Sequence, residues 1–146
     1  MKITQPLVEI IDQPAGLQGI FQMIELAGRT CYKSENRITE TSAQEFVNRM
    51  IESKHFSMLE QGTVYLKFPA YGYKDEDGQC LSALAVKYYT NYSKRIIHNE
   101  DAYITTNYRV LVENNWLDDL KYLCEPTEFH ERRVSVKFST QIIITR

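Results

Sequence analysis

The sequence predicts a mixed α and β fold in which helices pack on one face of an antiparallel sheet. Apolar residues recur at helical spacing in segments 17–27 and 42–51, which favours two amphipathic helices. In segment 63–69 they alternate with polar residues, which is the pattern of a half-buried strand. Segment 93–106 indicates a hairpin that turns near residues 98–101 and supplies two further strands.

Length, composition and charge narrow the class of protein. A chain of 146 residues is long enough to bury a core, and we expect residues 1–146 to form a single domain. Its net charge of -2 provides no overall basic field for nucleic acid or an anionic membrane. Segment 1–16 lacks the features of a signal peptide, and no apolar run approaches the roughly 20 residues of a membrane span. Three widely spaced cysteines without a C-x-x-C pair favour a reduced, cytoplasmic protein.

The first elements are expected to be an edge strand and a helix. Residues 2–11 predict the strand, and Pro6 favours its position at a sheet edge. The apolar stripe of the helix is Leu17, Ile20, Phe21, Ile24 and Ala27. Gly28 is the expected end of this helix, because glycine is common just past helix C-termini.

The second helix and the strand after it have clearer signals. Ser42 and Glu45 predict a capping box at the helix start. The apolar stripe of the helix is Phe46, Val47, Met50 and Ile51. In the strand over 63–69, which Pro69 closes, the core-facing positions are Val64, Leu66 and Phe68.

After this strand, one segment has a clear structural signal and the next does not. Residues 73–79 indicate a solvated turn around Asp77 and Gly78, whereas residues 81–92 fit a helix or a strand equally. After the hairpin, Asn107 is expected to cap a short helix that runs through Leu111.

The C-terminal segments indicate a helix and two apolar strands. Residues 116–124 predict the helix, which Pro126 stops, and residues 134–138 alternate as a strand does. An apolar run at 142–144 follows, and the sequence ends at Arg146. This ending suggests either a buried terminal strand or a chain cut short of its natural end.

Two motifs connect the sequence to a known family. GRTCYKS at 28–34 ends the first helix, and HFSMLEQ at 55–61 precedes a strand. In this order they resemble the flavin-dependent thymidylate synthases, which carry Gly/Ala-Arg-x-Ser/Cys-Tyr and then Gly-His-x-Ser/Thr-x-x-Glu-His. Lys54 stands where the family usually has Gly, and Gln61 where it has a second His. The signal comes from the pair of motifs at this separation, because either alone has little specificity.

The resemblance implies a fold, a reaction and an assembly. The fold would be the N-terminal half of the family's α+β fold, matched closely over 15–68 and loosely over 102–146, with 69–101 as a family-variable insertion. Family members are homotetrameric FAD proteins of the methyltransferase class that serve dTMP biosynthesis. They convert dUMP to dTMP with methylenetetrahydrofolate and NADPH, and their FAD sites lie between subunits.

The family's strongest signature would lie beyond the sequence. It is an Arg-His-Arg motif with the dUMP-binding arginines and most FAD phosphate contacts, and the resemblance places it just after Arg146. The catalytic residues are therefore expected outside this chain. We expect the chain alone to be inactive as a thymidylate synthase.

The candidate cofactor-binding residues are Ser57, His55 and Glu60. The resemblance implies that Ser57 contacts the flavin cofactor, and a hydroxyl suits a phosphate or a nucleotide amine. Ser57 can equally be a helix or turn cap. His55 follows Lys54 at a helix C-terminus, where both meet the helix dipole favourably. Glu60 can simply pair with Arg29 or Lys54.

Other reactive side chains are assigned structural roles. Arg29 is interpreted as an anchor at a helix end. Cys31 is interpreted as a small core residue, because no neighbouring cation or His activates it as a nucleophile. His98 and His130 lack the paired ligands of a metal site, so no metal is expected.

Two further functional classes remain as alternatives. One is a truncated, non-catalytic module that folds and self-associates. The other is a module for single-stranded nucleic acid, because segment 87–95 mixes cations with Tyr88, Tyr89 and Tyr92, which can stack on bases. The acidic chain disfavours the second alternative.

Overall fold

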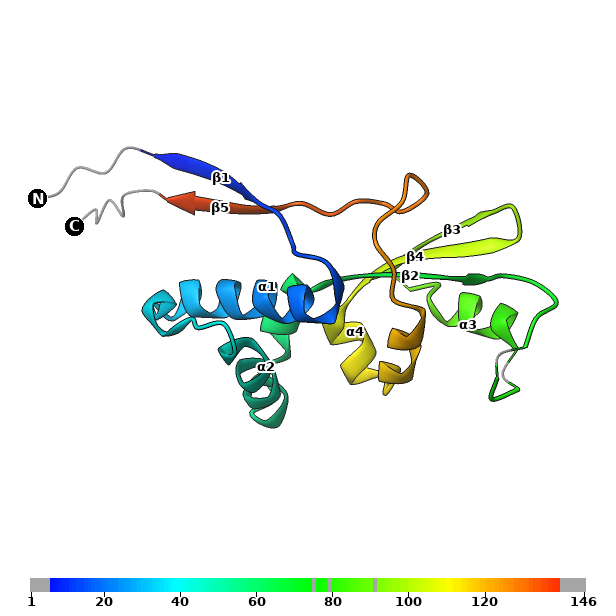
Figure 1. Cartoon of the computed structure of the whole chain (residues 1–146), viewed down its shortest axis with the longest axis horizontal. Helices are drawn as coiled ribbons and strands as arrows, with labels where there is room; N and C mark the ends of the chain where they lie inside the picture. The colour runs from blue at the N-terminus through cyan, green and yellow to red at the C-terminus, as the bar shows by residue number, and fades with distance from the viewer. Residues whose placement is uncertain (1–5, 75, 79, 91, 140–146) are drawn as a thin grey trace, which may run out of the picture.

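The structure, a computed structural model, describes residues 6–74, 76–78, 80–90 and 92–139 (Figure 1). Its strands are β1 (Leu7–Ile11), β2 (Thr63–Pro69), β3 (Lys94–His98), β4 (Asp101–Asn107) and β5 (Ser135–Ser139). Its α-helices are α1 (Gly16–Cys31), α2 (Ser42–Glu52), α3 (Leu81–Lys87) and α4 (Tyr108–Glu113). Short 3-10 helices are η1 (Glu35–Arg37), η2 (Phe56–Gln61) and η3 (Leu117–Tyr122).

The fold is α+β with antiparallel strands, as predicted, but the strands form two sheets instead of one. One sheet has the order β2-β4-β3, and the other is a two-stranded ribbon of β1 and β5. The α-helices lie on one side of the strands, and the ribbon extends as an arm along α1 (Figure 1). Alternation predicts that a segment is a strand, yet it does not choose its partner, so the separate pairing of β1 with β5 was not foreseen.

The three-stranded sheet is buried on both faces where β4 forms its centre. Leu66 lies opposite Ile104, and both are fully buried in the core shared with the helices. On the other face, the ring of Tyr103 contacts those of Phe129 and His130. The alternation predicted for β2 is confirmed, because Val64, Leu66 and Phe68 are core residues. The segment after η3 covers the second face of this sheet.

Gly28 does not end α1, so that prediction is wrong. The helix continues to Cys31, and Gly28 lies where α1 crosses α2. A Cβ atom at position 28 would lie 2.4 Å from Cζ of Phe46. The glycine therefore allows two helices to pack closely. In the sequence this tertiary role gives the same signal as a glycine that ends a helix.

The predicted capping box of α2 is also absent. Thr41 occupies the N-cap position, and no side-chain hydrogen bond caps the helix. The hydroxyl of Ser42 instead donates to Oε2 of Glu25 at 2.9 Å. Oε1 of Glu25 accepts hydrogen bonds from Arg29, so the carboxylate is shared between the two helices. A tertiary partner has replaced the local one, and Glu45 remains exposed.

Several local predictions are confirmed. The hairpin joins β3 to β4 through Asn99 and Glu100, both at positive φ. Asn107 caps α4, because its Oδ1 accepts a hydrogen bond from the backbone N–H of Val110 at 3.1 Å. The ambiguous segment 81–92 begins as helix α3, whereas the helix predicted over 116–124 is the 3-10 helix η3.

Segment 69–101, which the resemblance implies is a family-variable insertion, belongs to the body of the fold. It contributes α3 and β3, and its core residues are Leu81, Leu84, Ala85 and Tyr88. Three sequence predictions fall outside the described residues: the start of the first strand at 2–5, the apolar run at 142–144, and the chain end at Arg146.

Three helices end in the same hydrogen-bonded turn, which places a non-glycine residue at positive φ. Lys33 after α1 has φ +51°, Lys54 after α2 has φ +57°, and Asn115 after α4 has φ +58°. The backbone bonds of the first two turns run from Lys33 N to Thr30 O, Ser34 N to Arg29 O, Lys54 N to Ile51 O and His55 N to Met50 O. These are Schellman turns, in which glycine is the usual residue at the left-handed position.

Replacing Lys54 with glycine is expected to stabilise the protein by about 1 kcal/mol, because glycine adopts positive φ without the steric cost of a Cβ. Urea unfolding measures the change. Lys54→Ala is the control, because it removes the same charge and keeps the Cβ. Equal stabilities of the glycine and alanine variants would contradict the prediction.

Candidate functional site

The second motif lies on η2, between α2 and β2. The side chains of His55 and Ser57 are exposed, and neither forms a hydrogen bond with a described residue. Ser57 caps no helix in this part of the chain, so its hydroxyl stays available to a ligand. Glu60 pairs with Arg109, which also pairs with Glu113 at 2.9 Å, and not with the cations expected from sequence. Arg109 lies 49 positions from Glu60 in the sequence, so no local pattern predicted this ion pair.

The first motif is anchored by Arg29, as predicted. The side chain is buried, and its Nε and Nη2 both donate to Oε1 of Glu25 at 3.1 Å. Its guanidinium lies over the ring of Phe46, 5.0 Å from the centroid. Cys31, in contrast, is exposed, so its assignment to the core is wrong. It lies on the last turn of α1, on a side that faces a groove.

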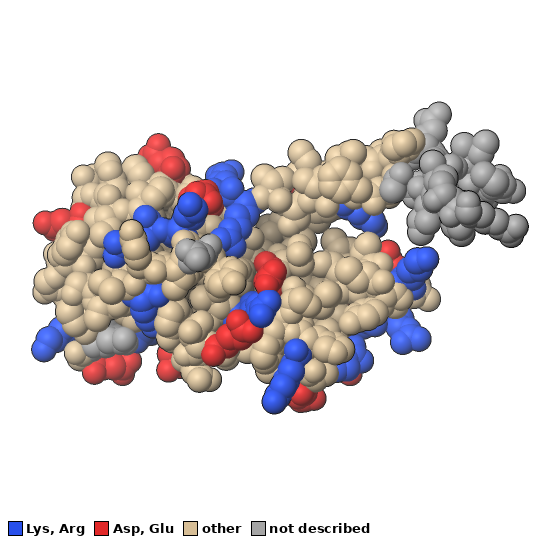
Figure 2. Space-filling model, turned by 180° about the vertical axis from the view of Figure 1, so that it is seen from behind, with Lys and Arg blue, Asp and Glu red and all other residues tan. Residues whose placement is uncertain are grey.

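Both motifs line that groove, which runs between α1 and the β1–β5 arm. Its volume is about 350 Å³. Figure 2 shows the hollow beneath the arm. Thr30 and Cys31 come from the first motif and Gln61 comes from the second. The other lining residues are Ile11, Met23, Leu26, Ala27, Ser135, Val136, Lys137 and Phe138.

The groove has the character of a small-molecule site. Its walls are mostly apolar, which suits a planar ring system, and Gln61 and Lys137 add polar groups at its edge. The volume is at the low end of the roughly 300–1,000 Å³ of small-molecule sites. Ser57 on η2 and His55, which precedes η2, lie outside the groove lining and are exposed.

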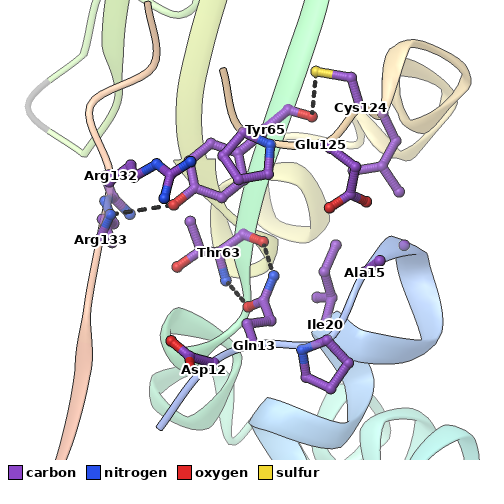
Figure 3. Close-up of a pocket in the computed structure, with 14 residues that line it drawn as sticks. Asp12, Gln13, Ala15, Ile20, Thr63, Tyr65, Cys124, Glu125, Arg132 and Arg133 are labelled. Carbon is purple, nitrogen blue, oxygen red and sulfur yellow. Dashed lines mark hydrogen bonds between the residues drawn. The ribbon is translucent and has the colours of Figure 1, made fainter. Parts of the chain in front are cut away.

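A second, smaller pocket of about 200 Å³ lies where the arm joins the body (Figure 3). Nε2 of Gln13 donates to the carbonyl of Thr63 at 2.8 Å, and Oε1 accepts from the N–H of Thr63 at 2.9 Å. The hydroxyl of Tyr65 accepts from the N–H of Arg133 at 3.2 Å. These groups bond one another, so the pocket is best interpreted as the joint that holds the arm on β2.

Cys124 and His130 lie close together without forming an activated pair. Sγ of Cys124 is 3.9 Å from Nε2 of His130, which donates to the carbonyl of Leu66 at 3.1 Å. Burial raises the pKa of the Cys124 thiol. Burial also lowers the pKa of His130, by more than its hydrogen bond to Leu66 raises it. Both groups are therefore neutral at pH 7, whereas a nucleophilic cysteine needs a thiolate.

Stability is expected to depend on the protonation of His130. Because its pKa is lower in the folded state than its ordinary value of about 6.5, the unfolded chain binds the proton more tightly. The free energy of unfolding should be highest above pH 6.5, fall as the pH drops below that value, and level off beneath the folded pKa. Urea unfolding across this range measures the effect. His130→Gln should remove the slope, and His55→Gln, at an exposed position, should retain it.

The aromatic segment predicted as a stacking platform is only partly exposed. Tyr88 is fully buried, and its hydroxyl donates to Oδ2 of Asp119 at 2.5 Å, so it cannot stack on bases. Burial, and then the bond to Asp119, raises the pKa of Tyr88. Tyr89 and Tyr92 remain exposed.

No group of three or more His, Cys, Asp or Glu side chains in the described part of the chain can hold a metal ion. Among the same residues, no helix has both the length and the apolarity that crossing a bilayer requires.

Comparisons with known proteins add no relative: no family model matches the chain, and no curated protein or solved structure matches it. The likeness to the flavin-dependent thymidylate synthases therefore depends on the two motifs and on their arrangement. Lys54 lies at a left-handed position, and the glycine usual in the family is the residue that adopts this conformation without strain.

Proposed function

We propose that this chain is a member of the flavin-dependent thymidylate synthase family and binds FAD. One observation carries the proposal: Thr30 and Cys31 of the first motif and Gln61 of the second, separated in sequence by a whole helix, line the same groove. A motif pair that arose by chance has no reason to meet at one cavity. In this proposal Ser57 and Glu60 on the adjacent η2, and His55 just before it, contact the cofactor.

The proposed reaction is the methylation of dUMP to dTMP, with methylenetetrahydrofolate as carbon donor and NADPH as reductant. A bound flavin supplies the redox chemistry, while the protein binds and orients it. The residues of this chain provide one wall. His55 and Ser57 offer exposed polar groups, and the ion pair with Arg109 holds Glu60 in place on η2.

The second wall would come from another copy of the chain, because the arm presents its apolar face outward. Val8, Ile10, Val136 and Phe138 share one face of the ribbon by register and are 59%, 68%, 42% and 71% exposed, although Val136 and Phe138 also border the groove. Ser135 and Lys137, on the opposite face, are half-buried and line the groove. A ribbon with its apolar face turned to solvent is typical of an association surface. This face supports a homo-oligomer, which is a homotetramer in the family.

The same face also supports a second candidate, a non-catalytic module that self-associates without a cofactor. Titration of FAD into the purified chain separates the two, with flavin fluorescence as the readout. A saturable fluorescence change supports the proposed function. No change, in a preparation that self-associates, supports the module instead.

Ser57→Ala is expected to weaken FAD binding by about 10- to 100-fold, because one hydrogen bond to a charged group contributes roughly 1.5–3 kcal/mol. Fluorescence titration of both proteins gives the two dissociation constants. The matched control is Ser53→Ala, because the Ser53 hydroxyl already donates to the carbonyl of Arg49 at 2.7 Å. An unchanged constant for Ser57→Ala would remove Ser57 from the site.

A further inference from the structure

A basic pocket lies at the end of α1, between η1 and α2. Its volume is about 480 Å³. Arg29, Lys33, Arg37 and Arg49 line it together with Tyr32, Ser34, Asn36, Phe46 and Met50. It shares no lining residue with the groove beneath the arm. Four cations and no carboxylate at one concavity are unexpected in a chain with a net charge of -2.

Three of the four cations have no acidic partner. Arg29 is neutralised by Glu25, whose second oxygen is already occupied by Ser42. Lys33, Arg37 and Arg49 form no ion pair within the described residues. The pocket therefore holds uncompensated positive charge, which an anion would balance.

The positions of two guanidinium groups are set before any ligand arrives. Arg29 and Arg49 both lie over the ring of Phe46, 5.0 Å and 5.5 Å from its centroid. Phe46 is buried between α1 and α2. Contacts with an aromatic face restrict a flexible side chain, so less conformational entropy is lost when an anion binds.

The backbone turn at the end of α1 places Lys33 at the pocket. It also satisfies helix carbonyls that would otherwise repel an anion. The last carbonyls of a helix carry partial negative charge, which would repel an anion. Here the carbonyls of Arg29 and Thr30 accept hydrogen bonds from Ser34 and Lys33. The turn that makes these bonds needs φ +51° at Lys33, where glycine would fit without strain. A strained lysine thus lines the pocket.

We propose that this pocket binds a small phosphorylated molecule whose phosphate groups contact Lys33, Arg37 and Arg49. Guanidinium and ammonium groups are the usual partners of phosphate. The pocket volume lies in the range of small-molecule sites. The net charge of -2 disfavours a nucleic acid as the ligand. The proposal does not depend on the thymidylate synthase assignment, because it uses different residues.

Isothermal titration of the whole chain with inorganic pyrophosphate tests the proposal, and two matched variants make it specific. Lys33→Gly and Lys54→Gly each remove one lysine and relieve the same left-handed strain at a helix end. Only Lys33 lines the pocket. Lys33→Gly is expected to weaken pyrophosphate binding about tenfold through loss of a charge-assisted contact. Lys54→Gly is expected to bind as the unaltered chain does.

Neither variant should fail to fold, because glycine suits both positions. Equal pyrophosphate affinities of the two variants would overturn the proposal, as would the absence of saturable, salt-sensitive binding to the unaltered chain. Competition by a single-stranded oligonucleotide, with affinity that grows with its length, would overturn it in favour of a nucleic-acid surface. Pyrophosphate binding by a preparation that binds no FAD would support this pocket and contradict only the proposed function.

Discussion

Replacing Glu25 with alanine is expected to lower the free energy of unfolding by about 3–5 kcal/mol, the cost of breaking a buried ion pair from one side. Glu25 is 1% exposed, and it accepts two hydrogen bonds from Arg29 and one from Ser42. The alanine variant would leave the guanidinium of Arg29 buried without its counter-charge. It would also remove the bond that links α1 to the start of α2. Urea unfolding monitored by circular dichroism measures the loss.

Two controls separate the buried pair from general effects of losing a carboxylate. Glu45→Ala removes an exposed carboxylate from α2 and should change stability by less than about 0.5 kcal/mol. Replacing both Glu25 and Arg29 with leucine should recover part of the loss, because no charge is then left buried. If Glu25→Ala unfolded within about 1 kcal/mol of the unaltered chain, the pair would not hold the two helices together.

Phe138→Asp is expected to abolish self-association through the arm. Phe138 is 71% exposed, and it lies opposite Val8 on the outward apolar face. Burial of one such ring contributes about 1.5–3 kcal/mol, and a symmetric pair of chains would lose it twice and bury two carboxylates. The dissociation constant should therefore rise by more than about 100-fold. Size-exclusion chromatography with light scattering measures the change.

Tyr89→Asp is the matched control, because it places the same charge at an exposed aromatic residue away from the arm. It should leave the oligomeric state unchanged. An unaltered chain that stays monomeric at every concentration would contradict the prediction, as would equal effects of the two variants. Phe138 also lines the groove, so Phe138→Asp is expected to lower FAD affinity directly as well as through the loss of self-association.

Predictions succeeded where the signal and its cause lie within a few residues. The hairpin of β3 and β4, the Asn107 cap and the apolar stripe of α2 each depend on neighbours two to four positions apart. Arg29 was predicted to anchor a helix end, and the structure shows that its partner is Glu25, one turn earlier in the same helix.

Predictions failed where a distant segment supplied the partner. Gly28 faces the ring of Phe46 across two helices, and Ser42 bonds Glu25 instead of capping its own helix. Glu60 pairs with Arg109, and Cys31 faces the groove instead of the core. The sequence alone does not distinguish a glycine that ends a helix from one that lets two helices pack closely. It also does not distinguish a serine that caps its own helix from one that bonds to another helix.

The order of residues was enough to place most of the helices and strands, and its two motifs suggested a flavin-dependent family, which in turn implied Ser57, His55 and Glu60 as candidates. The placement of the elements needs only local periodicity, and the family suggestion depends on the resemblance of two short motifs. The order of residues was not enough to show that β1 pairs with β5, that both motifs border one groove, or that four cations meet at the end of α1. Those features depend on which surfaces come into contact when the chain folds, and the free energy of such contacts is shared between segments far apart in sequence.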